Sequence, residues 1–357
     1  MMASNQTANR DEFAPFDAVV SRFGSDAEAS SRGRVADALL SKGYRLAELG
    51  RREEAIGAYD ESITRIGAAE EPELRARVAR ALVAKGVALD ALGRYAEALS
   101  IFDSVVIRFA GADDLLSREQ VARALGNKGY RVSELGRERE AQPIYDEVVE
   151  RFGDASEPEL REQVAMVLFN KGYGLSALTR HEDALVVYEA LAGRFGDASE
   201  PELRLQVAKA TLETAVSLYA LRRVEEAFAV YDEVVARFGG DTDGAVQRQV
   251  ASALSCKAAA LRDLSRVDEH IAVYDELIAR YREASEPALR YQLAAALYNK
   301  AVALDQLSKS DNVVAAYDAL LAEFAEDEGP AFVEQDAPTV AVLVARARSR
   351  RDYLTRT

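Results

Sequence analysis

The side chains that carry most acid–base, nucleophilic and metal chemistry are few in this 357-residue sequence. There are two histidines, His181 and His270, far apart along the chain, and one cysteine, Cys256, which shares no motif with a histidine. A catalytic site needs several polar groups that converge in one cavity, and no glycine-rich phosphate loop follows a strand-like segment. The sequence therefore predicts no catalytic residue, no metal site and no cofactor, and a protein that is not an enzyme.

Lysine is the residue type whose spacing does suggest a site. A lysine followed by glycine or alanine recurs every 43 residues, with Thr214 in the one gap: Lys42, Lys85, Lys128, Lys171, Lys257 and Lys300. Such a row can be read as a track for anions. It can also be structural, with each lysine stem packed and each ammonium paired to an aspartate that recurs one helix later: Asp60, Asp103, Asp146, Asp232, Asp275 and Asp318. Recurrence in nearly every copy favours the structural reading, since solvated ion pairs are common and rarely functional.

The same 43-residue step governs positions that cannot do chemistry. It links an aromatic residue in every copy (Phe16, Tyr59, Phe102, Tyr145, Tyr188, Tyr231, Tyr274, Tyr317). It also links a series of leucines (Leu49, Leu92, Leu135, Leu178, Leu221, Leu264, Leu307). A fixed period held through seven copies is the signature of a repeat architecture, in which each unit packs on its neighbours.

Each repeat is predicted to form two helices. In the fourth copy an apolar residue recurs every three or four positions from Leu160 to Leu178, which indicates a helix of about 20 residues. Thr179 and Arg180 make the turn, and a second apolar stripe ends near Phe195. We expect a capping box at Ser156 and a C-cap glycine at Gly196. No segment shows the period-2 alternation of a strand, so the predicted fold class is all-α.

The segment from Leu92 to Phe102 (Leu-Gly-Arg-Tyr-x-Glu-Ala-Leu-x-x-Phe) resembles the tetratricopeptide repeat. The resemblance covers residues 13–325 and implies a solenoid of helical hairpins wound into a right-handed α–α superhelix. It also implies that a small residue of the first helix packs against one of the second. These pairs are Gly86 with Ala98, Gly129 with Ala141, and Gly172 with Ala184. The family period is about 34 residues, and the additional residues fall in the repeated segment at 153–161 and 196–204.

Positions that differ between copies are free of the packing that all copies share, so binding residues are sought among them. The resemblance implies that the first helices line a concave face. We expect one exposed stripe through Tyr44, Val87, Tyr130 and Tyr173, with neighbouring stripes through Leu40, Val83 and Leu212 and through Asp90, Ser133 and Asp305. Tyrosine buries a large area at low entropic cost, which suits a binding surface. The predicted protein-binding groove consists of Tyr44, Tyr130, Phe169, Tyr173, Tyr219, Arg262 and Tyr298. The alternative is that these tyrosines only pack against the next repeat.

Some tetratricopeptide proteins clamp the C-terminal carboxylate of chaperones with basic residues and asparagines on successive first helices. Asn127 and Asn170 match one asparagine position of that pattern. The positions that should be basic hold Val83, Gly126 and Phe169 instead, which argues against this clamp.

Composition narrows the class of partner. The formal net charge of −15 argues against nucleic acid, whose partners usually show a basic surface. The single cysteine fits a reducing compartment, the first ten residues lack the apolar core of a signal peptide, and no apolar run is long enough for a membrane span. We therefore expect a soluble cytoplasmic protein that does not bind membranes.

The expected organisation is a flexible N-terminus (1–12), a solenoid made of a half-repeat and seven repeats (13–325), and an acidic linker with a basic C-terminal capping helix (326–357). The expected function is a non-catalytic scaffold or adaptor that binds another protein or peptide on its concave surface. The alternative is a structural solenoid that assembles into oligomers through its ends. The sequence leaves monomer and homo-oligomer both open.

Overall fold

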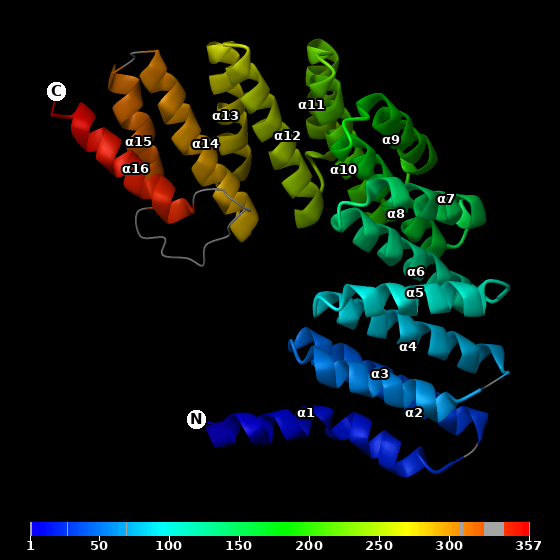
Figure 1. The fold of residues 1–357 in the computed structure, drawn as a ribbon. Helices are drawn as coiled ribbons and strands as arrows, with labels where there is room; N and C mark the ends of the chain where they lie inside the picture. The colour runs from blue at the N-terminus through cyan, green and yellow to red at the C-terminus, as the bar shows by residue number, and fades with distance from the viewer. Residues whose placement is uncertain (1, 27, 69, 308–309, 325–338, 357) are drawn as a thin grey trace. The chain divides into compact units, whose positions relative to one another are not determined.

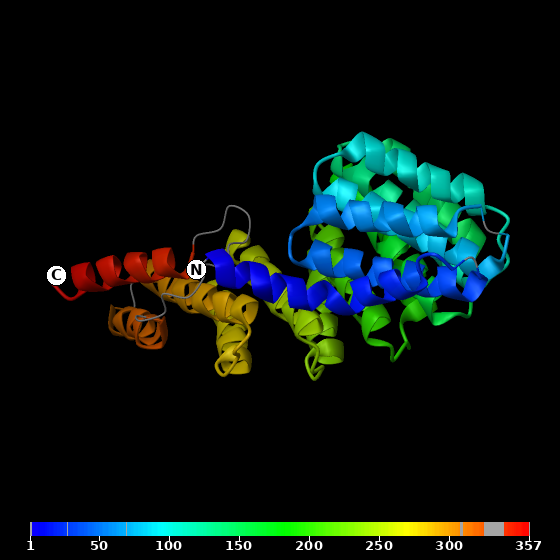
Figure 2. The ribbon, with the colours of Figure 1, turned by 90° about the horizontal axis from the view of Figure 1, so that it is seen from below.

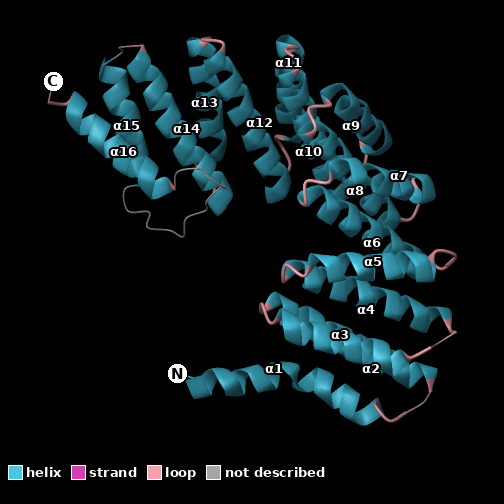
Figure 3. Cartoon of the chain, viewed as in Figure 1, coloured by secondary structure: helices cyan, strands magenta, loops and turns pink. Residues whose placement is uncertain are grey.

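The computed structural model describes residues 2–26, 28–68, 70–307, 310–324 and 339–356, which form sixteen helices and no strand (Figures 1 and 3). Helix α1 (Met2–Phe23) comes first and α16 (Val340–Leu354) last. Between them, first helices of 20 residues alternate with second helices of 15. The first helices are α2 (Ala29–Glu48), α4 (Pro72–Ala91), α6 (Leu115–Glu134), α8 (Pro158–Ala177), α10 (Pro201–Ala220), α12 (Gly244–Asp263) and α14 (Pro287–Gln306). The second helices are α3 (Arg52–Ile66), α5 (Tyr95–Phe109), α7 (Glu138–Phe152), α9 (His181–Phe195), α11 (Val224–Phe238), α13 (Val267–Tyr281) and α15 (Ser310–Phe324). The all-α prediction is confirmed.

The N-terminal segment is helical, and the expected C-terminal linker lies largely outside the described residues. Helix α1 begins at Met2, although a flexible segment was expected at residues 1–12. That segment contains no glycine or proline, so nothing in it stops a helix. The expected acidic linker falls largely on residues 325–338, which lie outside the described residues.

Six of the seven first helices start in one of two ways, and α2, which follows Glu28, uses neither. Four of them begin with a proline, whose missing N–H is not needed in the first turn. The residue before each proline is a glutamate in extended conformation that makes no side-chain cap: Glu71, Glu157, Glu200 and Glu286. The capping box expected at Ser156 is therefore wrong, because Glu157 is the N-cap. Helices α6 and α12 lack the proline and use an aspartate, with Asp114 accepting from the N–H of Ser117 at 2.8 Å.

The turn between the first and second helix of a repeat needs one residue with positive φ. Glycine fills this position in Gly50, Gly93 and Gly136, whereas Thr179, Arg222 and Ser265 adopt it without being glycine, at φ 60°, 64° and 59°. The glycines that follow the second helices differ from one another. Gly67, the C-cap of α3, has φ 64°. Gly196 is the C-cap of α9, as expected, but its φ of −54° and ψ of −40° lie in the right-handed region.

The helices group into two compact units, residues 1–178 and 179–357. Within the first unit, each first helix contacts the next (α2 with α4, α4 with α6, α6 with α8), and each second helix contacts the first helices on either side of it (Figures 1 and 2). Among the described residues no second helix contacts another second helix. The same pattern holds in the second unit for α10, α12, α14 and α16. Within each unit the first helices are therefore the more closely spaced layer.

The core of each repeat is centred on the recurring aromatic residue of the second helix. Tyr59, Phe102 and Tyr145 are almost fully buried. A Cβ placed on Gly86 would lie 2.5 Å from Cε1 of Phe102, and one on Gly129 would lie 2.4 Å from Cε1 of Tyr145. Ala98 and Ala141 are also buried, and the atoms nearest to a Cβ on either glycine belong to the aromatic ring of the same repeat. The direct packing of each glycine on its alanine stays a prediction.

The lysines that recur every 43 residues form ion pairs between repeats. Lys85 Nζ lies 2.7 Å from Asp60, Lys128 Nζ 2.6 Å from Asp103, and Lys42 Nζ 2.6 Å from Asp17. Lys171–Asp146, Lys257–Asp232 and Lys300–Asp275 complete the set. Five of the six expected aspartates bind a lysine, but not the lysine that was expected, while Asp17 was not foreseen and Asp318 binds Arg351. Each lysine bonds the aspartate of the preceding second helix, so these inter-repeat lysine pairs join neighbouring repeats.

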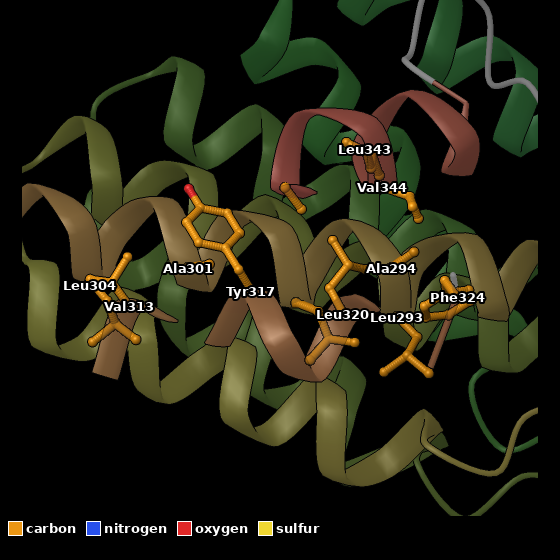
Figure 4. Packing of buried hydrophobic residues seen from close by; sticks show 12 residues of the cluster. Leu293, Ala294, Ala301, Leu304, Val313, Tyr317, Leu320, Phe324, Leu343 and Val344 are labelled. Carbon is orange, nitrogen blue, oxygen red and sulfur yellow. The ribbon is translucent and has the colours of Figure 1, made fainter. Parts of the chain in front are cut away.

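Helix α16 covers the last hairpin. Leu343, Val344 and Ala347 are buried against a cluster from α14 and α15 that includes Tyr317 and Leu320 (Figure 4). Leu343 stands where the next lysine of the series would be, and Arg351 takes over its ion pair by binding Asp318 at 2.8 Å. Arg350 binds Asp305 at 2.7 Å. Two of the basic residues of this helix are thus used inside the unit.

Candidate functional site

The expected stripe along the first helices is exposed in the first unit. Val87, Tyr130 and Tyr173 are 46 %, 45 % and 54 % exposed, on α4, α6 and α8. Tyr44 on α2 occupies the same register and is half-buried, with its ring edge against Tyr59 at a centroid distance of 5.8 Å. Large apolar side chains left open on successive helices are a feature of interaction surfaces.

The neighbouring stripes are not free surface. Leu40, Val83 and Leu212 are buried, because this register faces the next first helix. Asp90 binds Arg131 at 2.7 Å from the following repeat, and Ser133 donates to Glu138. These positions vary between copies, but packing and local hydrogen bonds account for them.

Within the first unit, the predicted site residues have two kinds of surroundings. Phe169 and Tyr173 stack on each other on α8, with ring centroids 6.2 Å apart. Tyr44 is covered by Arg80 of α4, whose guanidinium lies 5.4 Å from the ring centroid and whose Nε donates to the Tyr44 hydroxyl at 3.2 Å. Tyr44 is therefore held in place by a cation from the next repeat.

The other three predicted residues belong to the second unit. Tyr219 is half-buried on α10, and Tyr298 on α14 is half-buried with its ring 6.3 Å from that of Tyr317. Arg262 on α12 is exposed and lies 3.0 Å from the carboxylate of Asp263. Each unit thus contributes part of the predicted set, and a single groove that includes all seven residues stays a prediction.

A cavity of 280 Å³ opens beside Tyr44, and we call it the arginine pocket. Its charged residues are Arg52, Arg80 and Arg123, and no carboxylate lines it. Its remaining walls are Tyr44, Ala47, Tyr59, Val83, Ala84, Val87, Ala88, Ala91 and Gln120. A second cavity of 680 Å³ shares Arg80, Gln120 and Arg123 with it and continues along α2, α4 and α6.

The polar groups of the arginine pocket have little to bind inside the protein. Gln120 is 4 % exposed, and its amide makes no hydrogen bond within the described part of the chain. Neither Arg52 nor Arg80 takes part in an ion pair among the described residues, and Arg123 has only Glu119, at 3.3 Å. In a chain with a net charge of −15, a cavity lined by three guanidiniums and no carboxylate is a local concentration of positive charge, although the larger cavity beside it also holds Asp37, Glu73 and Glu119.

Sequence reasoning missed Arg52, Arg80, Gln120 and Arg123 because it considered three registers of the first helix. Arg80 and Arg123 share a fourth register, one turn before Val83, and the other copies hold different residue types there, including Asp37 and Lys209. The rule that variable positions carry binding would have selected them. Nothing in the sequence shows that Tyr44, seven residues beyond that register in the previous repeat, lines the pocket with them.

The residues considered for chemistry lie on three different helices, α9, α12 and α13. His270 is buried, its Nδ1 is 2.7 Å from the carbonyl oxygen of Ala258, and burial lowers its pKa. His181 is at the start of α9, and Cys256 is on α12. Within the described ranges no three His, Cys, Asp or Glu side chains are placed to hold a metal ion. None of the described helices is both long and apolar enough to cross a membrane.

No protein-family model matches this sequence, and no curated protein is similar to it. Solved structures do resemble its fold. The apo form of RapI has a TM-score of 0.58 at 10 % identity, over 83 % of this chain and 78 % of that one. The apo quorum sensor NprR from B. thuringiensis has a TM-score of 0.52 at 12 % identity, over 90 % and 86 %. A tetratricopeptide repeat protein from Parabacteroides merdae ATCC 43184 aligns at 11 % identity with a TM-score of 0.47, over 88 % and 98 %. By its fold, this chain is a repeat protein built of helical hairpins, similar in fold to RapI and NprR.

Proposed function

We propose that the chain is a non-catalytic, cytoplasmic interaction scaffold, and that the first-helix face of its first unit binds an acidic peptide or protein segment. The observation that carries the proposal is the arginine pocket. A partner carboxylate entering it meets Arg80 and Arg123, and guanidinium groups bind carboxylates with two parallel hydrogen bonds. The side-chain amide of Gln120 supplies a further hydrogen bond to the same ligand.

The surroundings of the pocket suit a peptide. Val83, Ala84, Val87 and Ala88 give it an apolar floor, and the larger cavity next to it extends the site over three first helices. Binding sites of this kind combine apolar walls with a few polar groups that fix orientation. The exposed Tyr130 and Tyr173 lie in the same register as Tyr44 on the following first helices, and we propose that they contact the remainder of the segment.

Selection from a random peptide library tests this function. We expect the selected peptides to be enriched in Asp and Glu, and the R80Q/R123Q variant to bind them at least tenfold more weakly, as befits the loss of two charge-assisted contacts. The control is R346Q/R348Q, which removes the same charge from two exposed arginines of α16. Selected peptides without acidic residues, or equal loss in both variants, would contradict the proposal.

A second variant tests how far the site extends. Replacing Phe169 and Tyr173 by alanine removes a stacked aromatic pair from α8. If a long acidic segment crosses this helix, the double variant loses more than about 1 kcal/mol of binding free energy, the usual mark of an interface hot spot. A folded F169A/Y173A protein with unchanged affinity would confine the site to the arginine pocket.

A further inference from the structure

The inter-repeat lysine pairs are interrupted at one place in the second unit. Thr214 on α10 stands where the other repeats have lysine, and its hydroxyl donates to the carbonyl of Ala210, one turn back in its own helix, at 2.8 Å. The carboxylate that a lysine at this position would bind belongs to Glu189 on α9. Glu189 takes part in no ion pair within the described residues. By contrast, Leu343 also replaces a lysine, but there Arg351 supplies the missing cation to Asp318.

Loss of the lysine leaves space as well as charge. In the intact pairs the lysine side chains are only 18–27 % exposed, so their stems are packed between the helices that they join. Beside Thr214 there is instead a groove of 610 Å³, lined by α9 on one side, α11 on the other, and Thr211, Thr214 and Leu218 of α10. Its volume is within the range of ordinary ligand sites, about 300–1,000 Å³.

We call this groove the Thr214 groove. Its lining combines aliphatic walls with a carboxylate, which are the two features that a lysine side chain needs in a partner. Leu185, Val186 and Val230 give it aliphatic walls, and Val186 is 66 % exposed. Its two arginines are already bound, Arg223 to Glu226 at 2.7 Å and Arg237 to Glu233 at 3.7 Å. Glu189 is thus the lining carboxylate that remains without a cation among the described residues.

We propose that the Thr214 groove binds a lysine side chain presented by a basic segment of a partner protein. The four-carbon stem lies along Leu185 and Val186, and the ammonium reaches Glu189, which reproduces from outside the pair that the other repeats make internally. The Thr214 groove belongs to the second unit, shares no residue with the arginine pocket of the first unit, and takes a ligand of opposite charge. The two proposals therefore stand or fall separately.

A methyl NMR titration of the 39.0 kDa chain tests the site, with the methyl groups of Leu185, Val186 and Val230 as reporters. The probe is the peptide acetyl-Gly-Gly-Lys-Gly-Gly-amide, and the control is the same peptide with Nε-acetyllysine, which keeps the stem and removes the charge. We expect saturable shifts of these methyl groups with a millimolar dissociation constant for the lysine peptide and none for the acetylated one. Equal shifts with both peptides, or shifts only elsewhere, would overturn the proposal.

Three variants sharpen the test. T214K restores the internal pair and should abolish the shifts. E189Q, at an exposed position, should weaken binding about three- to fivefold, as expected for one solvated ion pair. K257T removes the pair with Asp232 and should create a second site between α11 and α13, reported by new shifts of the Val273 methyl groups, which do not line the Thr214 groove. The proposal is refuted if the lysine peptide still binds T214K, or if K257T shows no second site. Either result would mean that the missing lysine does not create the groove.

Discussion

Gly86 and the ring of Phe102 are in direct contact across the two helices of one repeat, and a Cβ on Gly86 would lie 2.5 Å from Cε1 of that ring. The same relationship joins Gly43 to Tyr59 and Gly129 to Tyr145. Later repeats have alanine at the glycine position, as at Ala258, opposite Tyr274. The later repeats therefore carry a methyl group at the position where the earlier repeats bring a ring against glycine.

Replacing Gly86 by alanine should destabilise the protein, because the new methyl group overlaps a ring in a close-packed core. Overpacking of this kind costs about 1–3 kcal/mol of unfolding free energy. Gly57 provides a matched control, since it is also in a helix, on α3, and a Cβ there meets nothing within 4 Å. We expect G57A to stabilise by about 0.5–1 kcal/mol through helix propensity. Urea unfolding midpoints of the two variants should move in opposite directions; a stabilising G86A would contradict the account.

The turn residues with positive φ predict opposite changes in stability for substitutions to and from glycine. Arg222 and Ser265 occupy a left-handed conformation that costs an L-residue about 1–2 kcal/mol, whereas Gly93 occupies it freely. R222G and S265G should each raise the unfolding free energy by about 0.5 kcal/mol after the larger chain entropy of glycine is subtracted. G93A should lower it by about 1 kcal/mol. Melting temperatures measured under one set of conditions check this, and a destabilising S265G would show that the turn is not strained.

Glu213 on α10 predicts a dependence of stability on pH. Burial raises the pKa of this carboxyl above its ordinary value of 4.5, and no cation binds it among the described residues. It lies near Tyr231, and burial is the cause of its raised pKa. The neutral acid is therefore favoured in the folded state. Below pH 4.5 the carboxyl is neutral in both the folded and the unfolded state, so it does not lower the free energy of unfolding. That free energy falls as the pH rises from 4.5 through the raised pKa of Glu213.

An E213Q variant removes this charge at every pH. It should be more stable than the wild-type protein at pH 7, and the difference should shrink below pH 4.5, where both side chains are neutral. The control is E202Q, at an exposed glutamate of the same helix. Urea midpoints at pH 4 and pH 7 are the measurement. An advantage of E213Q that is the same at both pH values would mean that desolvation of the charge is not its cause.

The sequence predicted the elements of this fold well because the same local pattern occurs seven times. The turn at Thr179 and Arg180 and the first helix of about 20 residues agree with the structure. What could not be predicted was which of two equivalent partners a side chain selects. Lys85 stands between Asp60 and Asp103 in sequence, and a repeat offers the same two choices in every copy. Only the packing of one repeat on the next decides between them.

The candidate site shows the same limit. Exposure of Tyr130 and Tyr173 followed from the helical register, since neighbouring copies share one backbone geometry. The arginine pocket did not, because Tyr44, Arg80 and Arg123 come from three different repeats and meet only when α2, α4 and α6 lie side by side. Variation between copies marks such positions as free, but the distance between side chains of different repeats depends on how the first helices pack.

Charge exchange at Lys85 tests the pairing between repeats directly. Lys85 bonds Asp60 at 2.7 Å, while Asp103 of its own repeat bonds Lys128 at 2.6 Å. K85D places two carboxylates together and should destabilise by about 0.5–1 kcal/mol, the scale of a half-exposed ion pair. D60K added to K85D restores an opposite-charge pair with the polarity reversed and should recover most of the loss. D103K added to K85D should recover none, because Asp103 does not face residue 85 and the second change also breaks the pair with Lys128. Double-mutant cycles in low salt measure both couplings, and a rescue by D103K instead of D60K would refute the inter-repeat pairing.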